Sequence, residues 1–234
     1  MSRPTSGPQT GRPGVAEMSR PSVPEAYFAE MYSARADPWH LAERWYEQRK
    51  YALTLASLPA RRYRRAFEPG CSVGVLSALL ASRCEHLLSW DRRPEAVAVA
   101  GGRLEAFEGA EAALGTVPEQ WPDGEFDLVV FSELLYYFDA EERARLHRSA
   151  VRSLSDGGHL VAVHWRHHVP EHAAEGTQVH RELGELPELL PLAHHEEEDF
   201  LLDVFVRTHR PGQDGDTDGR TRRALSVAAL EGLL

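Results

Sequence analysis

An acidic residue and two glycines stand between a predicted strand and a predicted helix. Glu68 closes the predicted short strand 64–68, Gly70 follows it, and Gly74 opens the helical segment 74–82. A glycine turn at such a junction lets a ligand approach the backbone, because no Cβ is in the way. The glycine spacing is G-x-x-x-G, whereas dinucleotide sites have G-x-G-x-x-G, and a carboxylate here would repel a pyrophosphate. The pattern favours a ligand with a cationic amino acid end and a sulfonium, although a tight turn without a ligand would look the same.

A second carboxylate stands at the end of the next predicted strand. Asp91 follows the segment 86–90 and lies 21 residues after Gly70. That spacing is close to the roughly 20 residues at which a carboxylate reaches the ribose hydroxyls of an adenosine. A carboxylate accepts such bonds with charge assistance. Asp91 is also suited to cap the helix that begins at Pro94, and the two roles are compatible.

The elements that position these residues alternate along the chain. Strands are predicted at 64–68, 86–90, 112–115, 126–131 and 159–165, and helices at 74–82, 94–108 and 140–155. This alternation predicts an α/β, doubly wound, Rossmann-like sheet that is mostly parallel. A helix is expected near 177–186, and the segments 192–197 and 200–208 predict an antiparallel hairpin at the C-terminal edge.

The ends of the chain differ in composition from this core. Residues 1–23 are rich in Pro, Ser and Gly and predict a disordered tail. The domain is predicted to span 24–208, with helices at 24–32 and 43–58 forming an N-terminal helical cap (24–60). Residues 209–234 predict a linker and a short terminal helix.

Charge and cysteine content narrow the function classes. The formal net charge of −10 disfavours a nucleic-acid partner. The two cysteines have no disulfide-framework or metal spacing, and no signal peptide or membrane span is apparent, so we expect a cytoplasmic protein with a small-molecule substrate and no membrane partner. His194 and His195 are adjacent on a predicted strand and point to opposite faces, so we expect no metal there. The sequence gives no indication of oligomeric state.

The motifs in their order resemble the Rossmann-like methyltransferases that use S-adenosylmethionine (SAM). The series E-x-G-x-x-x-G, L-L-x-W-D, F-D-L-V-V and L-x-x-G-G-x-L-V covers residues 66–165. The segments DPW (37–39), WYEQRKY (45–51), SELLYY (132–137) and VHWR (163–166) are similar to the nodulation protein S (NodS) type, and extend the resemblance over most of 27–207. The founding members of that type are N-methyltransferases acting on the de-acetylated glucosamine of a chitin-type oligosaccharide, and relatives in other bacteria need not share that acceptor, so the resemblance implies the reaction type more than the substrate.

The resemblance implies SAM as the cofactor and an amine of an amino sugar or oligosaccharide as the methyl acceptor. O-methylation of a sugar or other small metabolite is an alternative. An NAD-binding oxidoreductase is a further alternative, which the missing third glycine and Glu68 disfavour. A binding protein without turnover is another, which the presence of Glu68, Gly70, Gly74 and Asp91 disfavours.

Two residues are predicted to be catalytic. Glu133, after the fourth strand, and His164, at the end of the fifth, are expected to bind the acceptor amine or to take its proton. The alternatives are a solvent-facing turn carboxylate for Glu133 and a structural, hydrogen-bonded histidine beside Trp165 for His164.

Further residues are predicted to contact the cofactor. Tyr46 and Arg49 are expected to close over it, with Arg49 pairing its carboxylate, unless Arg49 is a solvated helix charge. Thr116 stands where the family usually has an acidic residue near the adenine. Cys71 is expected to pack in the cofactor loop without acting as a nucleophile, since no base is beside it. The predicted cofactor site is completed by Val117 and Ser132.

Overall fold

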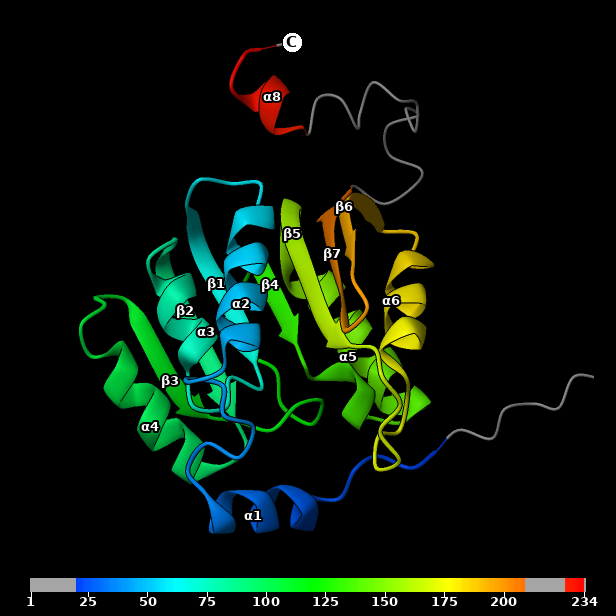
Figure 1. Cartoon of the computed structure of the whole chain (residues 1–234). Helices are drawn as coiled ribbons and strands as arrows, with labels where there is room; N and C mark the ends of the chain where they lie inside the picture. Colours follow the sequence, from blue (N-terminus) through cyan, green and yellow to red (C-terminus); the bar gives the residue numbers. More distant parts are fainter. Residues whose placement is uncertain (1–19, 209–225, 234) are drawn as a thin grey trace, which may run out of the picture.

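A computed structural model describes residues 20–208 and 226–233. Within them, one sheet has the strand order β3-β2-β1-β4-β5-β7-β6 (Figure 1). Its strands are β1 (Tyr63–Pro69), β2 (Cys84–Asp91), β3 (Ala110–Leu114), β4 (Phe126–Ser132), β5 (Leu154–Trp165), β6 (Leu189–Glu196) and β7 (Phe200–Arg207). The first five pair in parallel, while β7 is antiparallel to both β5 and β6. The predicted fold class and the antiparallel edge hairpin are confirmed.

Helices cover both faces of the sheet, because the central strands are apolar on both sides. On one face, Phe67, Val129 and Leu160 pack towards α5 (Ala140–Ser153) and α6 (Gly176–Gly184). On the other face, a second cluster joins the sheet to α2 (Trp45–Ser57), α3 (Val75–Ala81) and α4 (Pro94–Leu104). Residues of that cluster include Tyr51, Leu80, Leu104, Leu128, Val130 and Val161. Such two-sided burial explains the continuous apolar runs of β4 and β5.

The N-terminal segment closes one end of this sandwich. Helix α1 (Glu25–Ala34) lies across the end of the sheet where the parallel strands finish (Figure 1). Ser22 and Val23, which the sequence assigned to a tail, are bonded here: the Ser22 hydroxyl accepts the Asp139 N–H at 2.7 Å, and the Val23 N–H donates to the Tyr137 carbonyl at 2.8 Å. The packed chain therefore extends to these residues, because they supply partners for the turn before α5.

The start of the fifth strand differs most clearly in its local structure from the prediction. The turn Asp156-Gly157-Gly158 was expected to separate a helix from the fifth strand, but it lies within β5. Phe126 pairs with Leu154, and the register then shifts before Leu128 pairs with His159. Gly157 has a φ of +75°, so it accommodates this irregularity at low steric cost.

The described residues include only part of the chain ends for which structure was predicted. Residues 1–19 and the predicted linker 209–220 lie outside the described residues. Helix α8 (Val227–Leu230) falls within the predicted terminal helix. Among the helices of the described ranges, none combines the length and the apolar character needed to cross a bilayer.

Candidate functional site

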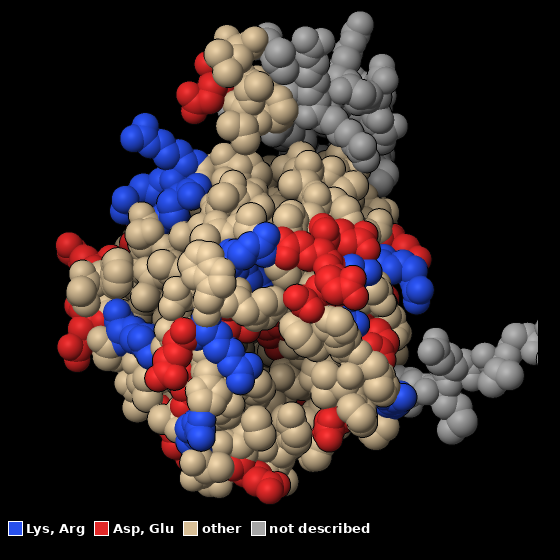
Figure 2. All heavy atoms as spheres, in the orientation of Figure 1, with Lys and Arg blue, Asp and Glu red and all other residues tan. Residues whose placement is uncertain are grey.

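A cavity of about 530 Å³ lies at the carboxyl ends of the parallel strands. Strand ends form its floor, and α1 and α2 contribute to its walls through Tyr27, Phe28, Tyr46 and Lys50. This is the place where open parallel sheets bind ligands. Acidic and basic side chains are interspersed over the face of the molecule seen in Figure 2. The chemistry of the cavity therefore depends on the charges inside it.

Glu68 lies in the floor of the cavity at the end of β1. Its side chain is held by the hydroxyls of Ser77 and Ser89, which donate to Oε2 at 2.6 and 2.8 Å. Both bonds go to one oxygen, and Oε1 has no hydrogen-bond partner in the part of the chain that the structure describes. Burial of this residue, which is 2 % exposed, raises the pKa of Glu68 to about 7. The site thus keeps a carboxylate oxygen available to a cationic ligand.

Asp91 stands beside Glu68 at the end of β2 and also lines the cavity. Its Oδ2 accepts the Ser72 N–H at 2.8 Å and its Oδ1 accepts the Arg93 N–H at 2.9 Å. Burial raises the pKa of Asp91, and these backbone bonds oppose the shift. Asp91 therefore ties the glycine turn to Arg93 and faces the cavity; the N-cap residue of α4 is Arg93, and contact of Asp91 with a ribose stays a prediction.

The two glycines of the turn have different tasks. Gly70 has a φ of +76° and lines the cavity, and a Cβ there would lie 2.7 Å from Leu134 Cδ1. Gly74, with the same φ, faces α4, where a Cβ would lie 2.7 Å from the Cβ of Ala100. Gly70 shapes the ligand site, whereas Gly74 allows two helices to pack. Cys71 lines the cavity, and burial raises the pKa of its thiol, which fits a packing residue.

Tyr46 reaches the cavity from α2 with a polar atom that lacks a partner. Its hydroxyl is buried and makes no hydrogen bond to any described residue. Its ring meets Trp165 edge-on at 5.6 Å. Since a buried hydroxyl without a partner is costly, this atom fits a ligand that completes it.

The remaining predicted cofactor residues divide between two hollows. Val117 and Ser132 line the cavity as predicted. Thr116 instead lines an adjoining hollow of about 440 Å³, and its N–H donates to Gln120 Oε1. Gly115 lines the main cavity at this point. The strand end is in the expected place, but Gly115 and Val117 line the cavity there and Thr116 does not.

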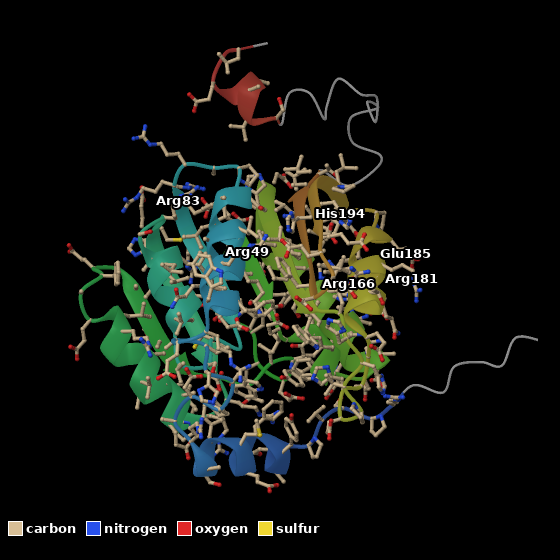
Figure 3. The ribbon with its side chains drawn as sticks, in the orientation of Figure 1. Arg49, Arg83, Arg166, Arg181, Glu185 and His194 are labelled. Atoms are coloured by element: carbon tan, nitrogen blue, oxygen red, sulfur yellow. The ribbon has the colours of Figure 1, made fainter. Side chains whose placement is uncertain are left out.

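Arg49 points away from the cavity, contrary to the prediction. Its guanidinium donates to both carboxylate oxygens of Glu197, at 2.7 and 2.6 Å, and it is absent from the cavity wall (Figure 3). Helix geometry explains the error. Tyr46 and Lys50, four residues apart on α2, share the face towards the cavity, and Arg49 lies on the side towards the β6–β7 turn.

Lys50 is a functional candidate that the sequence reasoning missed. Its ammonium lies 2.6 Å from Glu133 Oε1 and 2.9 Å from Glu47 Oε2, and the residue is 1 % exposed. It is the only lysine in a chain whose other positive side chains, histidine aside, are all arginine. That singular use of lysine was the signal available in the sequence.

Glu133 lines the cavity, as predicted, but it is firmly held. Its Oε2 accepts the Tyr136 hydroxyl at 2.5 Å and the Trp165 N–H at 2.9 Å, and Lys50 pairs with Oε1. Burial alone would raise the pKa of Glu133, but the Lys50 ammonium and these hydrogen bonds outweigh it and hold the pKa below its usual value. Glu133 is therefore a stable carboxylate anchor and a weak base.

His164 does not reach the cavity. The residue is fully buried, its Nε2 accepts the Leu135 N–H at 3.2 Å, and its Nδ1 lies 3.0 Å from His180 Nε2. Burial holds the pKa of His164 well below its usual value. The alternative of a structural histidine fits this geometry, and direct contact with the acceptor does not.

Comparison with known proteins identifies the family. The family model described as Nodulation protein S (NodS) matches residues 29–171, more than half of the chain. The chain belongs to the NodS family. Nodulation protein S of Rhizobium tropici is 32% identical over 130 residues, covering 55% of this chain and 55% of the relative. That of Sinorhizobium fredii is 30% identical over 151 residues, covering 63% of this chain and 69% of the relative. The matched region spans about half the length of the first relative.

Solved structures agree with this assignment. A putative methyltransferase from Pseudomonas syringae is 48% identical with a TM-score of 0.63, and the match covers 70% of this chain and 100% of that one. The N-methyltransferase NodS from Bradyrhizobium japonicum WM9, in complex with S-adenosyl-L-homocysteine, is 27% identical with a TM-score of 0.70 over 78% of this chain and 98% of that one. The resemblance to NodS-type methyltransferases is confirmed for fold and family.

Proposed function

We propose that this protein transfers a methyl group from SAM to an amine of a small molecule, with an amino sugar or oligosaccharide as the acceptor class. The observation that carries the proposal is one cavity with two kinds of wall. Glu68 and Asp91 form an acidic wall to which, among the described residues, no lysine or arginine side chain is bonded. In the same cavity, Glu133 is paired with Lys50.

The residues present fit SAM. The unpartnered Oε1 of Glu68 suits a cationic end, and Asp91 suits ribose hydroxyls. Gly70, Cys71, Val117 and Ser132 would line the nucleoside, and the Tyr46 hydroxyl would gain the partner that it lacks. When bound, SAM supplies a methyl group on a good leaving group. The volume of about 530 Å³ falls within the range of small-molecule sites.

Aromatic side chains and a fixed carboxylate support an amine-bearing ring as the acceptor. Tyr46, Tyr136 and Trp165 line the cavity together with Glu133. Tyr136 stacks on His172 with a centroid distance of 4.0 Å. Aromatic faces and edges pack against apolar ring faces, and a carboxylate binds a polar hydrogen. Because its pKa is low, Glu133 would orient the acceptor and would remove a proton poorly.

This anchoring role favours nitrogen over oxygen as the methyl acceptor. A neutral amine attacks without prior deprotonation and needs mainly alignment and exclusion of water. A sugar hydroxyl needs a base in the transition state, and the Lys50-paired Glu133 is a weak one. O-methylation therefore remains the second candidate.

We also propose that the protein acts in the cytoplasm on small molecules and without nucleic acid. The support is the net charge of −10, which disfavours phosphate backbones, and two cysteines that are free and buried in the described fold.

Titration calorimetry with SAM, S-adenosyl-L-homocysteine and NAD tests the cofactor part of the proposal. We expect saturable binding of both sulfur compounds and weak or undetectable binding of NAD, because Glu68 repels a pyrophosphate. Tight NAD binding without SAM binding would identify an oxidoreductase and end the proposal.

A further inference from the structure

A row of buried polar side chains runs from behind the cavity to the outer strands. His164 on β5 meets His180 on α6 with 3.0 Å between Nδ1 and Nε2, and His180 Nδ1 lies 2.5 Å from Asp203 Oδ2 on β7. Asp203 Oδ1 lies 2.7 Å from Nδ1 of His194 on β6, whose side chain is 57 % exposed (Figure 3). None of the four lines the cavity.

The first bond of the row fixes the protonation of the histidines that follow. The Leu135 backbone N–H can only donate, so His164 Nε2 must accept and its proton must sit on Nδ1. That proton is donated to His180 Nε2, which leaves the His180 proton on Nδ1, facing the Asp203 carboxylate. Both rings are therefore neutral, and Asp203 fixes the direction of the row at its outer end.

The Leu135 N–H, which donates to His164 at the inner end of the row, belongs to the turn that carries Glu133 and Tyr136. Leu135 opens the short 3-10 helix Leu135–Tyr137, whose first N–H groups lack intrahelical partners. Glu133, two residues earlier, has a φ of +52°. Leu135 is fully buried, so His164 supplies its N–H with an acceptor in place of water. The turn that carries Glu133 and Tyr136 is thus bonded to His164 through the Leu135 N–H.

The helix that brings His180 into line is packed unusually close to β5. A Cβ on Gly176, the first residue of α6, would lie 2.1 Å from the Trp165 carbonyl oxygen and 3.5 Å from His164 Cβ. Only glycine permits this approach. The contact is thus a specific arrangement of β5 and α6 at the level of His164.

We propose that His164 is a positioning residue, oriented by His180 and Asp203, which holds the Leu135 turn and thereby presents Glu133 and Tyr136 to the acceptor. This inference rests on the proposed function for its catalytic consequence. The geometry of the turn is testable without any turnover.

Two substitutions of nearly equal size test the roles of the two ring nitrogens of His164 separately. In His164→Gln the side-chain oxygen replaces Nε2 as an acceptor for the Leu135 N–H. In His164→Asn the shorter amide replaces the Nδ1 donor and leaves that N–H without a partner. We expect His164→Asn to lower kcat about tenfold or more with little change in SAM affinity, because an unpaired buried donor shifts the turn. His164→Gln should retain kcat within about threefold.

The single lysine provides a readout that does not depend on activity. In protein labelled with ¹⁵N-lysine, the Lys50 Nζ resonance reports its contact with Glu133. We expect this resonance to move in His164→Asn and to stay in place in His164→Gln. In wild-type protein labelled with ¹⁵N-histidine, His164 should show a protonated Nδ1 and an unprotonated Nε2.

The outcomes separate the two proposals. A protonated Nε2 on His164, or equal effects of the two substitutions on the Lys50 resonance, overturns the positioning role even if the wild-type enzyme is active. If wild-type protein methylates no amine while the Lys50 resonance behaves as expected, the proposed function fails and the positioning role stands. If neither variant folds, the tautomer of the wild-type ring decides.

Discussion

The two walls of the cavity hold their carboxylates in opposite ways. Glu68 and Asp91 are fixed by hydroxyl and backbone donors no more than 21 residues away in the chain. Glu133 is fixed across 83 residues by Lys50 on α2. The first wall belongs to the turns of the sheet itself, and the second exists only when the N-terminal helices have docked.

This difference is also one of charge. Burial raises the pKa of both Glu68 and Asp91, so each carboxylate gains from a cation that arrives with a ligand. Lys50 lowers the pKa of Glu133 against the effect of burial, so that carboxylate is ionised before any ligand binds. Glu68 and Asp91 therefore gain a counter-charge only when a cationic ligand binds, whereas Glu133 already has its counter-charge in Lys50.

Removing the ammonium of the second wall should have the largest effect. Lys50→Met leaves Glu133 and Glu47 without their cation, and we expect the free energy of unfolding to fall by about 3 kcal/mol at neutral pH. The lowered pKa of Glu133 means that this stabilisation is present above the ordinary pKa of a glutamate and is lost as the pH falls through the lower folded value. The difference in the free energy of unfolding between Lys50→Met and the wild type should therefore become smaller at acidic pH.

Chemical denaturation at several pH values measures this difference. Arg49→Met is the matched control, since it changes the neighbouring cation that pairs with Glu197 on the surface. Equal destabilisation by the two substitutions would show that the buried cluster has no special role.

Asp91→Asn should weaken SAM binding by about thirtyfold, corresponding to about 2 kcal/mol. The amide cannot accept from the Ser72 and Arg93 N–H groups with both of its polar atoms, and it loses the charge that strengthens bonds to hydroxyls. Calorimetry gives the affinity. Asp123→Asn makes the same chemical change at an exposed position and should leave the affinity unchanged.

Glu68 should make SAM binding depend on pH near neutrality. Its pKa of about 7 in the folded protein means that ionising it costs stability between the ordinary glutamate value and about pH 7. A cationic ligand recovers part of this cost, so affinity should rise several-fold from pH 6 to pH 8. Glu68→Gln should abolish this rise, and an identical pH profile in the variant would assign the dependence to another group.

Tyr46→Phe should have the smallest effect on affinity. It removes a hydroxyl that has no partner among the described residues, so the unfolding free energy should hold or increase slightly. Ligand binding should weaken by about fivefold if the hydroxyl bonds to the ligand, which corresponds to about 1 kcal/mol. Unchanged affinity for both SAM and acceptor would remove Tyr46 from the site.

The contrast between the walls also explains what the sequence could predict. The strand order and the pair Glu68 and Asp91 follow from local patterns, because apolar strands bring their own ends to one edge. Lys50 was missed because its role depends on how α2 docks. Arg49 was misplaced because it is adjacent to Lys50 in the chain and therefore about 100° away from it around the helix, where Glu197 supplies its partner.

His164 shows the same limit at the strand level. The sequence placed it correctly at the end of β5, but its partners His180 and Asp203 come from α6 and β7. Strand alternation does not tell which face a helix will later cover. The ring was therefore predicted in the cavity, whereas it lies behind the cavity wall.

Methyl transfer from radiolabelled SAM to a matched pair of acceptors tests the central claim most directly. The pair is a chitin-type oligosaccharide with one free amine and the same oligosaccharide fully N-acetylated. We expect label on the free amine at saturating SAM and none on the fully acetylated oligosaccharide. Equal labelling of both would place the methyl group on oxygen and contradict N-methylation.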